Sequence, residues 1–367
     1  MKRISLLMVV TAVLLCGRAF ALESDEILQS QVDALDLEGL QQSAEDYAPE
    51  MDWTQTPDLD GGLSNLLETG TGALRGVVRK ALHSGVLLLT IVLLAGLAEG
   101  AVACGTGKTI QAVPVAAALA ITAVSVADAN TLIGLGREVM EGMEQFSKVL
   151  LPTITAAVAA SGSPGGAAAR QMATMLFSDV LMTLINRVLL PLVYAYIAAC
   201  TAYAAVGNAG LKRIAATLKW VVTSILTTVL LAFIGYLSVS GVIAGTTDAV
   251  TLKAAKFTVS SVVPVVGGIL SDAAETVLAG AAILKNSVGV FGMLVVLGMC
   301  VIPFLQLGVH YLTYKVTAAL SATVADSRLV SLIDGIGGAF GLVLGMTGAC
   351  ALLLLISMVS AVSVTSL

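Results

Sequence analysis

Charged side chains inside strongly apolar stretches are the residues best able to do chemistry in this sequence. Asp179 and Arg187 lie in one such stretch, and Asp272 and Glu275 lie in another. A charge at bilayer depth is costly, so these groups should face a bundle interior, an aqueous cavity or the membrane interface. Asp179 and Arg187 are eight residues apart, which places them on one face of an unbroken helix. We therefore take these four residues as candidates for a polar path, with a plain interfacial location as the alternative.

Other arrangements that support catalysis or ligand binding are missing from the sequence. The five cysteines form no CxxC pair, and His83 and His310 have no cysteine or carboxylate at metal-ligand spacing. His310 stands beside Tyr311 and Tyr314, as in an aromatic belt at a membrane surface. Gly105-Thr106-Gly107-Lys108-Thr109 looks like the end of a phosphate-binding loop but lacks the glycine required at position 102. We expect no catalytic residue, no metal site, no cofactor and no enzymatic activity.

Composition identifies helices in lipid as the elements that carry the polar groups. Hydrophobic residues make up 57% of the 367 residues and charged residues only 12%, against roughly 25% charged in soluble domains. The sequence therefore predicts an all-α, polytopic helical membrane protein with about six to eight spans. The apolar segments that fit spans are 84–103, 110–127, 172–206, 220–244, 286–309 and 332–362.

Three regions leave alternatives open. Segment 172–206 is either one kinked helix or two spans, because Asn186, Arg187 and Pro191 interrupt it. Segment 149–160 is a short span or a re-entrant half-helix, and segment 252–284 looks interfacial or re-entrant. An amphipathic stretch with charges of both signs precedes segment 149–160, at Arg137, Glu138, Glu141, Glu144 and Lys148.

The N-terminal region has the organisation of an exported protein. Residues 1–21 predict a signal peptide, with a short basic start, an apolar core and cleavage after Ala21. Residues 22–83 contain thirteen acidic and three basic residues and predict a small, helical, extracytoplasmic segment. Such an acidic segment does not bind nucleic acid. Residues 84–130 should form the first transmembrane hairpin.

Four prolines suggest an internal duplication. Pro152 and Pro191 are 39 residues apart, and so are Pro264 and Pro303, each after two apolar residues. We take them as candidate helix breaks and expect two related membrane units, 137–244 and 251–362. Interrupted helices in paired repeats are common in transporters. Chance is the alternative, because apolar residues followed by proline are frequent in membrane helices.

Two further patterns predict orientation and packing. Lys212, Arg213 and Lys219 form the densest basic loop after the acidic segment, and the positive-inside rule places that loop in the cytoplasm. Gly337, Gly341 and Gly345 are spaced four residues apart and predict a ridge for close helix packing.

Several phrases resemble the stage III sporulation protein AE family along nearly the whole chain. One phrase, Leu35-Asp36-Leu37-Glu38-Gly39-Leu40, follows the signal peptide. A second runs from Lys253-Ala254-Ala255-Lys256 through Val263-Pro264-Val265-Val266-Gly267-Gly268 to Leu270-Ser271-Asp272-Ala273-Ala274-Glu275-Thr276-Val277. The apolar phrase with Pro303 and the phrase Asp326-x-Arg328 also fit.

The resemblance implies a role in endospore formation in a Gram-positive bacterium. Proteins of that family sit in the mother-cell membrane around the forespore, in a secretion-like, multi-protein channel or feeding-tube complex. The acidic segment would then meet ring-forming partners between the two membranes. The family supplies no established catalytic residues.

The leading hypothesis is therefore a membrane component of that channel complex, in contact with lipid, other membrane proteins and ring-forming partners. One alternative is a secondary transporter or permease of a small solute. Another is a membrane scaffold whose helices only anchor ring-forming partners. Assembly into a homo-oligomer is left open.

Overall fold

The computed structural model describes residues 35, 37–42, 44, 59–103, 112–160, 164–262 and 266–363. It describes side chains within these ranges except near their ends, at Leu237 and across 240–280. The described residues contain helices and no strands. The helices are α2 (Leu37–Gln42), α3 (Leu59–Ala103), α4 (Ala112–Ala160), α5 (Pro164–Leu184), the π-helical turn η1 (Ile185–Leu189), α6 (Leu190–Val206), α7 (Ala209–Val262), α8 (Val266–Ser321) and α9 (Ser327–Ser363).

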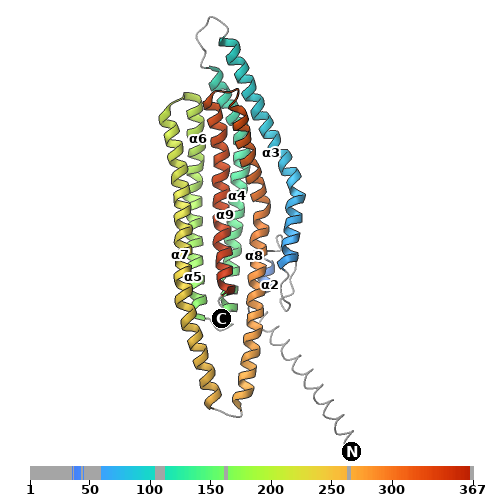
Figure 1. Ribbon diagram of the computed structural model, residues 1–367, viewed down its shortest axis with the longest axis vertical. Helices are drawn as coiled ribbons and strands as arrows, with labels where there is room; N and C mark the ends of the chain where they lie inside the picture. The colour runs from blue at the N-terminus through green and yellow to red at the C-terminus, as the bar shows by residue number, and fades with distance from the viewer. Residues whose placement is uncertain are drawn as a thin grey trace, which may run out of the picture.

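These helices form an elongated up-and-down bundle (Figure 1). Six helical runs are long and apolar enough to cross a membrane: Asp60–Gly100, Val113–Ala160, Ala173–Val206, Ala209–Tyr236, Ala281–Ser321 and Ser327–Val359. The prediction of an all-α, polytopic helical membrane protein is confirmed.

Basic residues gather at one end of the bundle, which we call the upper end, as in Figure 1. The turn between α6 and α7 and the turn between α8 and α9 both lie there. Lys212, Arg213 and Lys219 follow the first turn, and Arg328 follows the second. α4 and α9 end toward the opposite, lower end, where α7 and α8 continue beyond the other helices.

Several helices run through boundaries that the sequence suggested. α3 begins at Leu59, inside the acidic segment, and passes position 84 without a break. α4 passes from 130 to 137 and includes residues 149–160, so that short segment is the end of a long helix and not a re-entrant one. Segment 252–284 forms the ends of α7 and α8 on either side of residues 263–265, and its interfacial or re-entrant location stays a prediction.

Two of the expected proline breaks are wrong. Pro152 lies inside α4 and Pro303 lies inside α8, and both helices continue past them. A proline removes only one backbone donor, and neighbouring helices and Ser or Thr hydroxyls can compensate within a membrane bundle. Beside Pro152, the Thr153 hydroxyl donates to the Val149 carbonyl at 2.9 Å.

Pro191 comes closest to a predicted break, because it follows a π-helical turn. The Leu190 N–H donates to the carbonyl of Ile185, five residues earlier, at the end of η1. Such wide single turns occur inside otherwise regular helices. The chain still forms one continuous helical run from Ala173 to Val206, so the single-helix alternative for segment 172–206 is the observed one.

α9 is the best-buried span, and small residues let its neighbours approach closely. A side chain on Gly337 would meet Tyr314 Cβ of α8 at 2.9 Å, and one on Gly341 would meet Tyr311 at 3.1 Å. On another side of α9, a side chain on Gly338 would meet Tyr196 Oη of α6 at 2.9 Å. The predicted ridge is confirmed at Gly337 and Gly341.

Part of the acidic segment packs on the bundle. Leu37 and Leu40 of α2 are buried, and α2 contacts α4. The predicted signal peptide, most of residues 22–58 and Pro264 lie outside the described residues. The expected duplication stays a prediction, although the hairpins α6–α7 and α8–α9 both turn at the upper end (Figure 1).

Candidate functional site

The candidate polar path is not assembled inside the bundle. Asp179 of α5 and Arg187 of η1 are both exposed. The ion pairs among the described side chains do not include a pair between them. Asp272 and Glu275 belong to α8, but their side chains lie outside the described part of the chain. Within one copy of the protein, Asp179 and Arg187 therefore face outward.

α4 carries a larger set of charges on its outward side. Arg137 pairs with Glu141, and Lys148 pairs with Glu144, each at 2.8 Å. The Arg137 and Lys148 side chains are 59% and 66% exposed. We call this set the α4 charged face; it consists of Arg137, Glu138, Glu141, Glu144 and Lys148.

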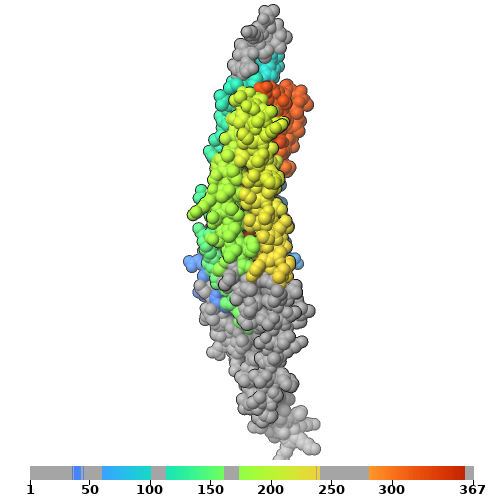
Figure 2. Space-filling view, turned by 90° about the vertical axis from the view of Figure 1, so that its left-hand side faces the viewer, coloured from blue at the N-terminus to red at the C-terminus, as the bar shows by residue number. Residues whose placement is uncertain are grey.

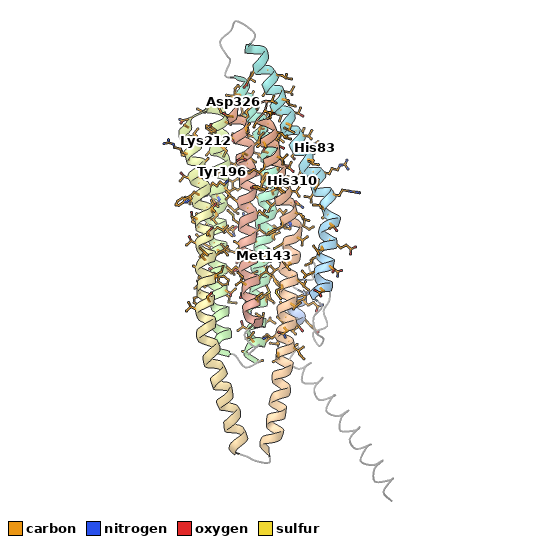
Figure 3. All side chains as sticks on the ribbon, viewed as in Figure 1. His83, Met143, Tyr196, Lys212, His310 and Asp326 are labelled. Atoms are coloured by element: carbon orange, nitrogen blue, oxygen red, sulfur yellow. The ribbon has the colours of Figure 1, made fainter. Side chains whose placement is uncertain are left out.

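The opposite side of α4 shows why the helix orients this way. Met140, Met143, Phe146 and Leu150 are buried in the bundle. They alternate with the charged residues at three- and four-residue steps, so burying one side of α4 turns the charges outward. Met143, labelled in Figure 3, lies inward near mid-height of the bundle.

Contacts between helices show what lies level with the lower part of this face. Leu150 of α4 and Met358 of α9 both approach Gly292 of α8. Thr174 of α5 bonds to Ser357 at 2.7 Å, next to Met358. These contacts place the lower end of the α4 charged face level with Thr174 of α5.

α7 is apolar on its outer side at that same level. The rings of Phe177 in α5 and Phe233 in α7 are 5.4 Å apart, which brings the middle of α7 to this height. There α7 exposes Leu231, at 63%, and Ile234. Figure 2 looks onto the side that α5 and α7 form. At one height, the bundle thus has a charged side on α4 and an apolar side on α7.

A pocket of about 500 Å³ opens at the upper end, between the hairpins α6–α7 and α8–α9. We call it the upper pocket. Its lining residues are Tyr196, Cys200, Tyr203, Lys212, Ala215, Ala216, Lys219, Lys315, Ala318, Ala319, Ala322, Val330, Ser331, Asp334 and Gly335. Figure 3 shows Tyr196 and Lys212 at this end of the molecule.

Three ammonium groups and one carboxylate give the upper pocket its charge. Lys315 Nζ pairs with Asp334 Oδ1 at 2.6 Å and also donates to the Asp334 carbonyl at 3.3 Å. Lys212 Nζ stands 5.7 Å from the centre of the Tyr203 ring, within the range of a cation–π contact. Lys212 and Lys219 are seven residues apart, so two turns of α7 present them on one side.

The sequence patterns identified only some of the residues that line the upper pocket. Lys212 and Lys219 belong to the predicted basic loop and line it, whereas Arg213 is exposed and is not among the lining residues. Lys315, Asp334, Tyr196 and Tyr203 were missed as a group, because they come from α6, α8 and α9. Asp334 could have been identified from the sequence, because it is an acidic residue within the apolar run of α9.

A buried network joins α4 to α8 below this pocket. The Tyr314 hydroxyl donates to Asp128 Oδ2 at 2.9 Å and lies 3.3 Å from Ser125 Oγ. Tyr314 packs edge-on against Phe340, and His310 packs against the same ring. His310 and Tyr314 are buried, so the expected aromatic belt is wrong for these two residues. The presence of Asp128 in an apolar stretch is explained by this hydrogen bond, which anchors Tyr314.

The phrase Asp326-x-Arg328 also has a structural explanation. Asp326 precedes α9, and its Oδ1 accepts the Arg328 backbone N–H at 2.9 Å, as expected of an N-cap aspartate. The Arg328 guanidinium lies over Gly207, the turn residue between α6 and α7. The two residues therefore start α9 and join the two upper turns.

Among the described residues, no group of three or more His, Cys, Asp or Glu side chains could hold a metal ion. The polar groups instead form an outward charged face, a basic upper pocket and a satisfied internal network. The geometry fits binding, conduction or assembly within a membrane.

Comparison with known proteins agrees with the resemblance. The family model for stage III sporulation protein AE matches residues 64–365. The stage III sporulation protein AE of Bacillus subtilis (strain 168) is 25% identical over 205 residues, which are 56% of this chain and 51% of that protein. The match thus spans about half the length of this relative, and no solved structure matches the chain. The six apolar helical runs suit a multi-pass membrane protein. The family model covers most of the chain, and this chain therefore belongs to the stage III sporulation protein AE family.

Proposed function

We propose that this protein is an integral membrane component of the mother cell–forespore channel complex required for endospore formation, without enzymatic activity of its own. Membership of a stage III sporulation family supports the sporulation role. The α4 charged face is the structural observation that favours a component of an assembly over a protein that stands alone in lipid.

The α4 charged face needs a covering that tolerates charge. Arg, Lys or Asp at the centre of a lipid-facing helix costs about 2.5–3.5 kcal/mol per residue. The α4 charged face has five charged residues, of which Arg137, Glu138 and Lys148 are exposed. Its lower end is level with Leu231 and Ile234 on the apolar side of α7. Lipid suits the α7 side but not the α4 side. A partner protein or a water-filled lumen suits the α4 side, and a channel complex supplies both.

Orientation is part of the same proposal. The basic upper end lies in the mother-cell cytoplasm, in keeping with the positive-inside rule. The lower end, with the acidic segment and the extensions of α7 and α8, then lies between the mother-cell and forespore membranes. There the acidic segment would meet the ring-forming partners.

Two measurements in a sporulating host test the role. Deleting the gene should abolish heat-resistant spores, and the tagged full-length chain should co-purify from sporulating membranes with other membrane proteins of the stage III complex. Normal spore numbers without the gene, or a tagged chain recovered alone under gentle extraction, would contradict the proposal.

Thiol labelling tests the environment of the α4 charged face directly. A cysteine at Lys148, at the lower end of the α4 charged face, should react with a membrane-impermeant maleimide, whereas cysteines at Leu231 and Ile234 should react only with a lipid-soluble one. The parent chain measures background labelling, which is expected to be low at Cys200, Cys300 and Cys350 because they are buried. Equal labelling of α4 and α7 positions would remove the argument for a covered or water-filled side.

A second candidate function is transport of a small solute by the chain itself, and the upper pocket favours it. Its volume of about 500 Å³ lies within the usual range for small-molecule sites. Robust solute uptake by liposomes that contain only this purified chain would establish the transporter over the channel component.

A further inference from the structure

We propose that the upper pocket binds a phosphate-bearing anion. Lys212, Lys219 and Lys315 supply three positive charges to the lining, and Asp334 supplies the single negative charge. Lysine ammonium groups bind phosphate as point charges. The pocket lies between two helical hairpins, so several helices can contribute donors to one ligand. This inference concerns binding and does not depend on whether the chain conducts or transports anything.

The donors differ in how far they are already engaged. Lys315 is held by Asp334 at 2.6 Å. Lys212 contacts the Tyr203 ring, a contact that leaves its N–H groups available. Lys219 is in no ion pair among the described side chains. Two of the three ammonium groups are therefore available to an added anion, while the third is fixed in place.

Gly338 lets Tyr196 and Lys219 approach α9 closely beside the upper pocket. A methyl group built on Gly338 would lie 2.9 Å from Tyr196 Oη and 3.8 Å from Lys219 Nζ. The Tyr196 hydroxyl and the Lys219 ammonium group thus lie near each other, against α9. The Tyr196 hydroxyl is hydrogen-bonded to the Cys200 thiol, so Lys219 is the donor at this wall that is available to a phosphate oxygen.

The walls indicate that the ligand also has a nonpolar part. Alanines from α7, α8 and the turn after α8 cover much of the surface between the charged groups: Ala215, Ala216, Ala318, Ala319 and Ala322. Next to Lys219, Trp220 is 68% exposed, and exposed tryptophans in membrane proteins lie at headgroup depth. Basic pockets between helices at that depth bind acidic lipid headgroups. A lipid phosphate and a soluble phosphate are the two sources of this chemistry.

The test uses the purified full-length chain in nanodiscs. Binding of phosphatidylglycerol is measured against phosphatidylcholine by native mass spectrometry, and binding of inorganic phosphate by calorimetry. The double variant Lys212→Gln/Lys219→Gln should lower affinity for the bound species by about tenfold or more, since each charged hydrogen bond contributes strongly. The matched control Arg75→Gln/Arg79→Gln removes two charges from an exposed part of α3 and should leave affinity unchanged.

A third variant distinguishes a loss of anion binding from misfolding. Asp334→Asn releases Lys315 and removes the only acid among the lining residues, so it should bind the anion more tightly, which a misfolded protein would not do. Selective phosphatidylglycerol binding without phosphate binding identifies a lipid, and the reverse identifies a soluble ligand. Equal losses in the pocket variant and the control, or weaker binding by Asp334→Asn, would overturn the proposal.

Discussion

The guanidinium of Arg328 occupies the space that a side chain on Gly207 would need. Gly207 has φ 74°, and its N–H donates to the Tyr203 carbonyl at 2.8 Å as α6 ends. Glycine is favoured at position 207 for two reasons. The backbone is left-handed there, and the Arg328 guanidinium leaves no room for a side chain. Through this contact the start of α9 rests on the turn between α6 and α7.

Replacing Gly207 by alanine should therefore destabilise the upper end. The left-handed conformation and the clash with Arg328 together should cost about 1–3 kcal/mol. Thermal unfolding of the detergent-solubilised protein would measure the loss. Gly76→Ala is the matched control, because nothing lies within 4 Å of a side chain at Gly76. Arg328→Ala in the Gly207→Ala background should recover part of the stability, and no recovery would mean that the clash is unimportant.

Tyr314→Phe should destabilise the bundle more than its small change in volume suggests. It leaves the half-buried Asp128 carboxylate without the hydroxyl that donates at 2.9 Å, and a hydrogen bond to a charged group contributes about 1.5–3 kcal/mol. Tyr236→Phe serves as the control, because Tyr236 is exposed on α7. Chemical unfolding in mixed micelles would report both. Similar stability of the two variants would show that Asp128 finds another donor.

New charge should be tolerated on α4 but not on α7. Leu231→Lys places an ammonium group on the apolar outer side, at an expected cost of about 2.5–3.5 kcal/mol, and should reduce the amount of chain recovered in membranes. Glu141→Lys on the α4 charged face should leave that amount unchanged. Quantitative blots of membrane fractions compare the two, and an equal reduction would argue that lipid covers both sides.

The channel and scaffold hypotheses differ in how spore formation responds to outward charges. If ions or solutes pass along the charged side, Asp179→Asn or Arg187→Gln should lower heat-resistant spore counts without lowering the amount of protein in membranes. A scaffold predicts that both variants sporulate normally and that deletion of residues 22–82 abolishes sporulation. Spore counts paired with membrane blots separate these outcomes.

The sequence predicted the spans well because each one is an apolar run bounded by charge or turn residues. Lys212 and Lys219 were identified for the same reason, as charges close together in a basic loop. Helix lengths were underestimated. The polar start of α3 and the charged middle of α4 resemble helix ends in sequence, yet each continues an apolar helix that packs on α8.

Properties that depend on packing between distant segments were harder to predict. His310 resembles an interfacial residue beside Tyr311, but helix phase turns its ring toward Phe340. Asp334 meets Lys315 across two helices, a contact that spacing along the chain does not indicate. Pro152 and Pro303 suggested interruptions because proline removes a backbone bond, whereas the surrounding bundle keeps both helices continuous.

α7 and α8 are much longer than a membrane span requires. α7 has 54 residues, which is about 80 Å of helix and more than twice the thickness of the hydrocarbon layer. A rigid helix of that length converts a tilt of about 10° at one end into a displacement of about 14 Å at the other. A small repacking at the upper end of the bundle would therefore move the lower end of α7 by a large distance.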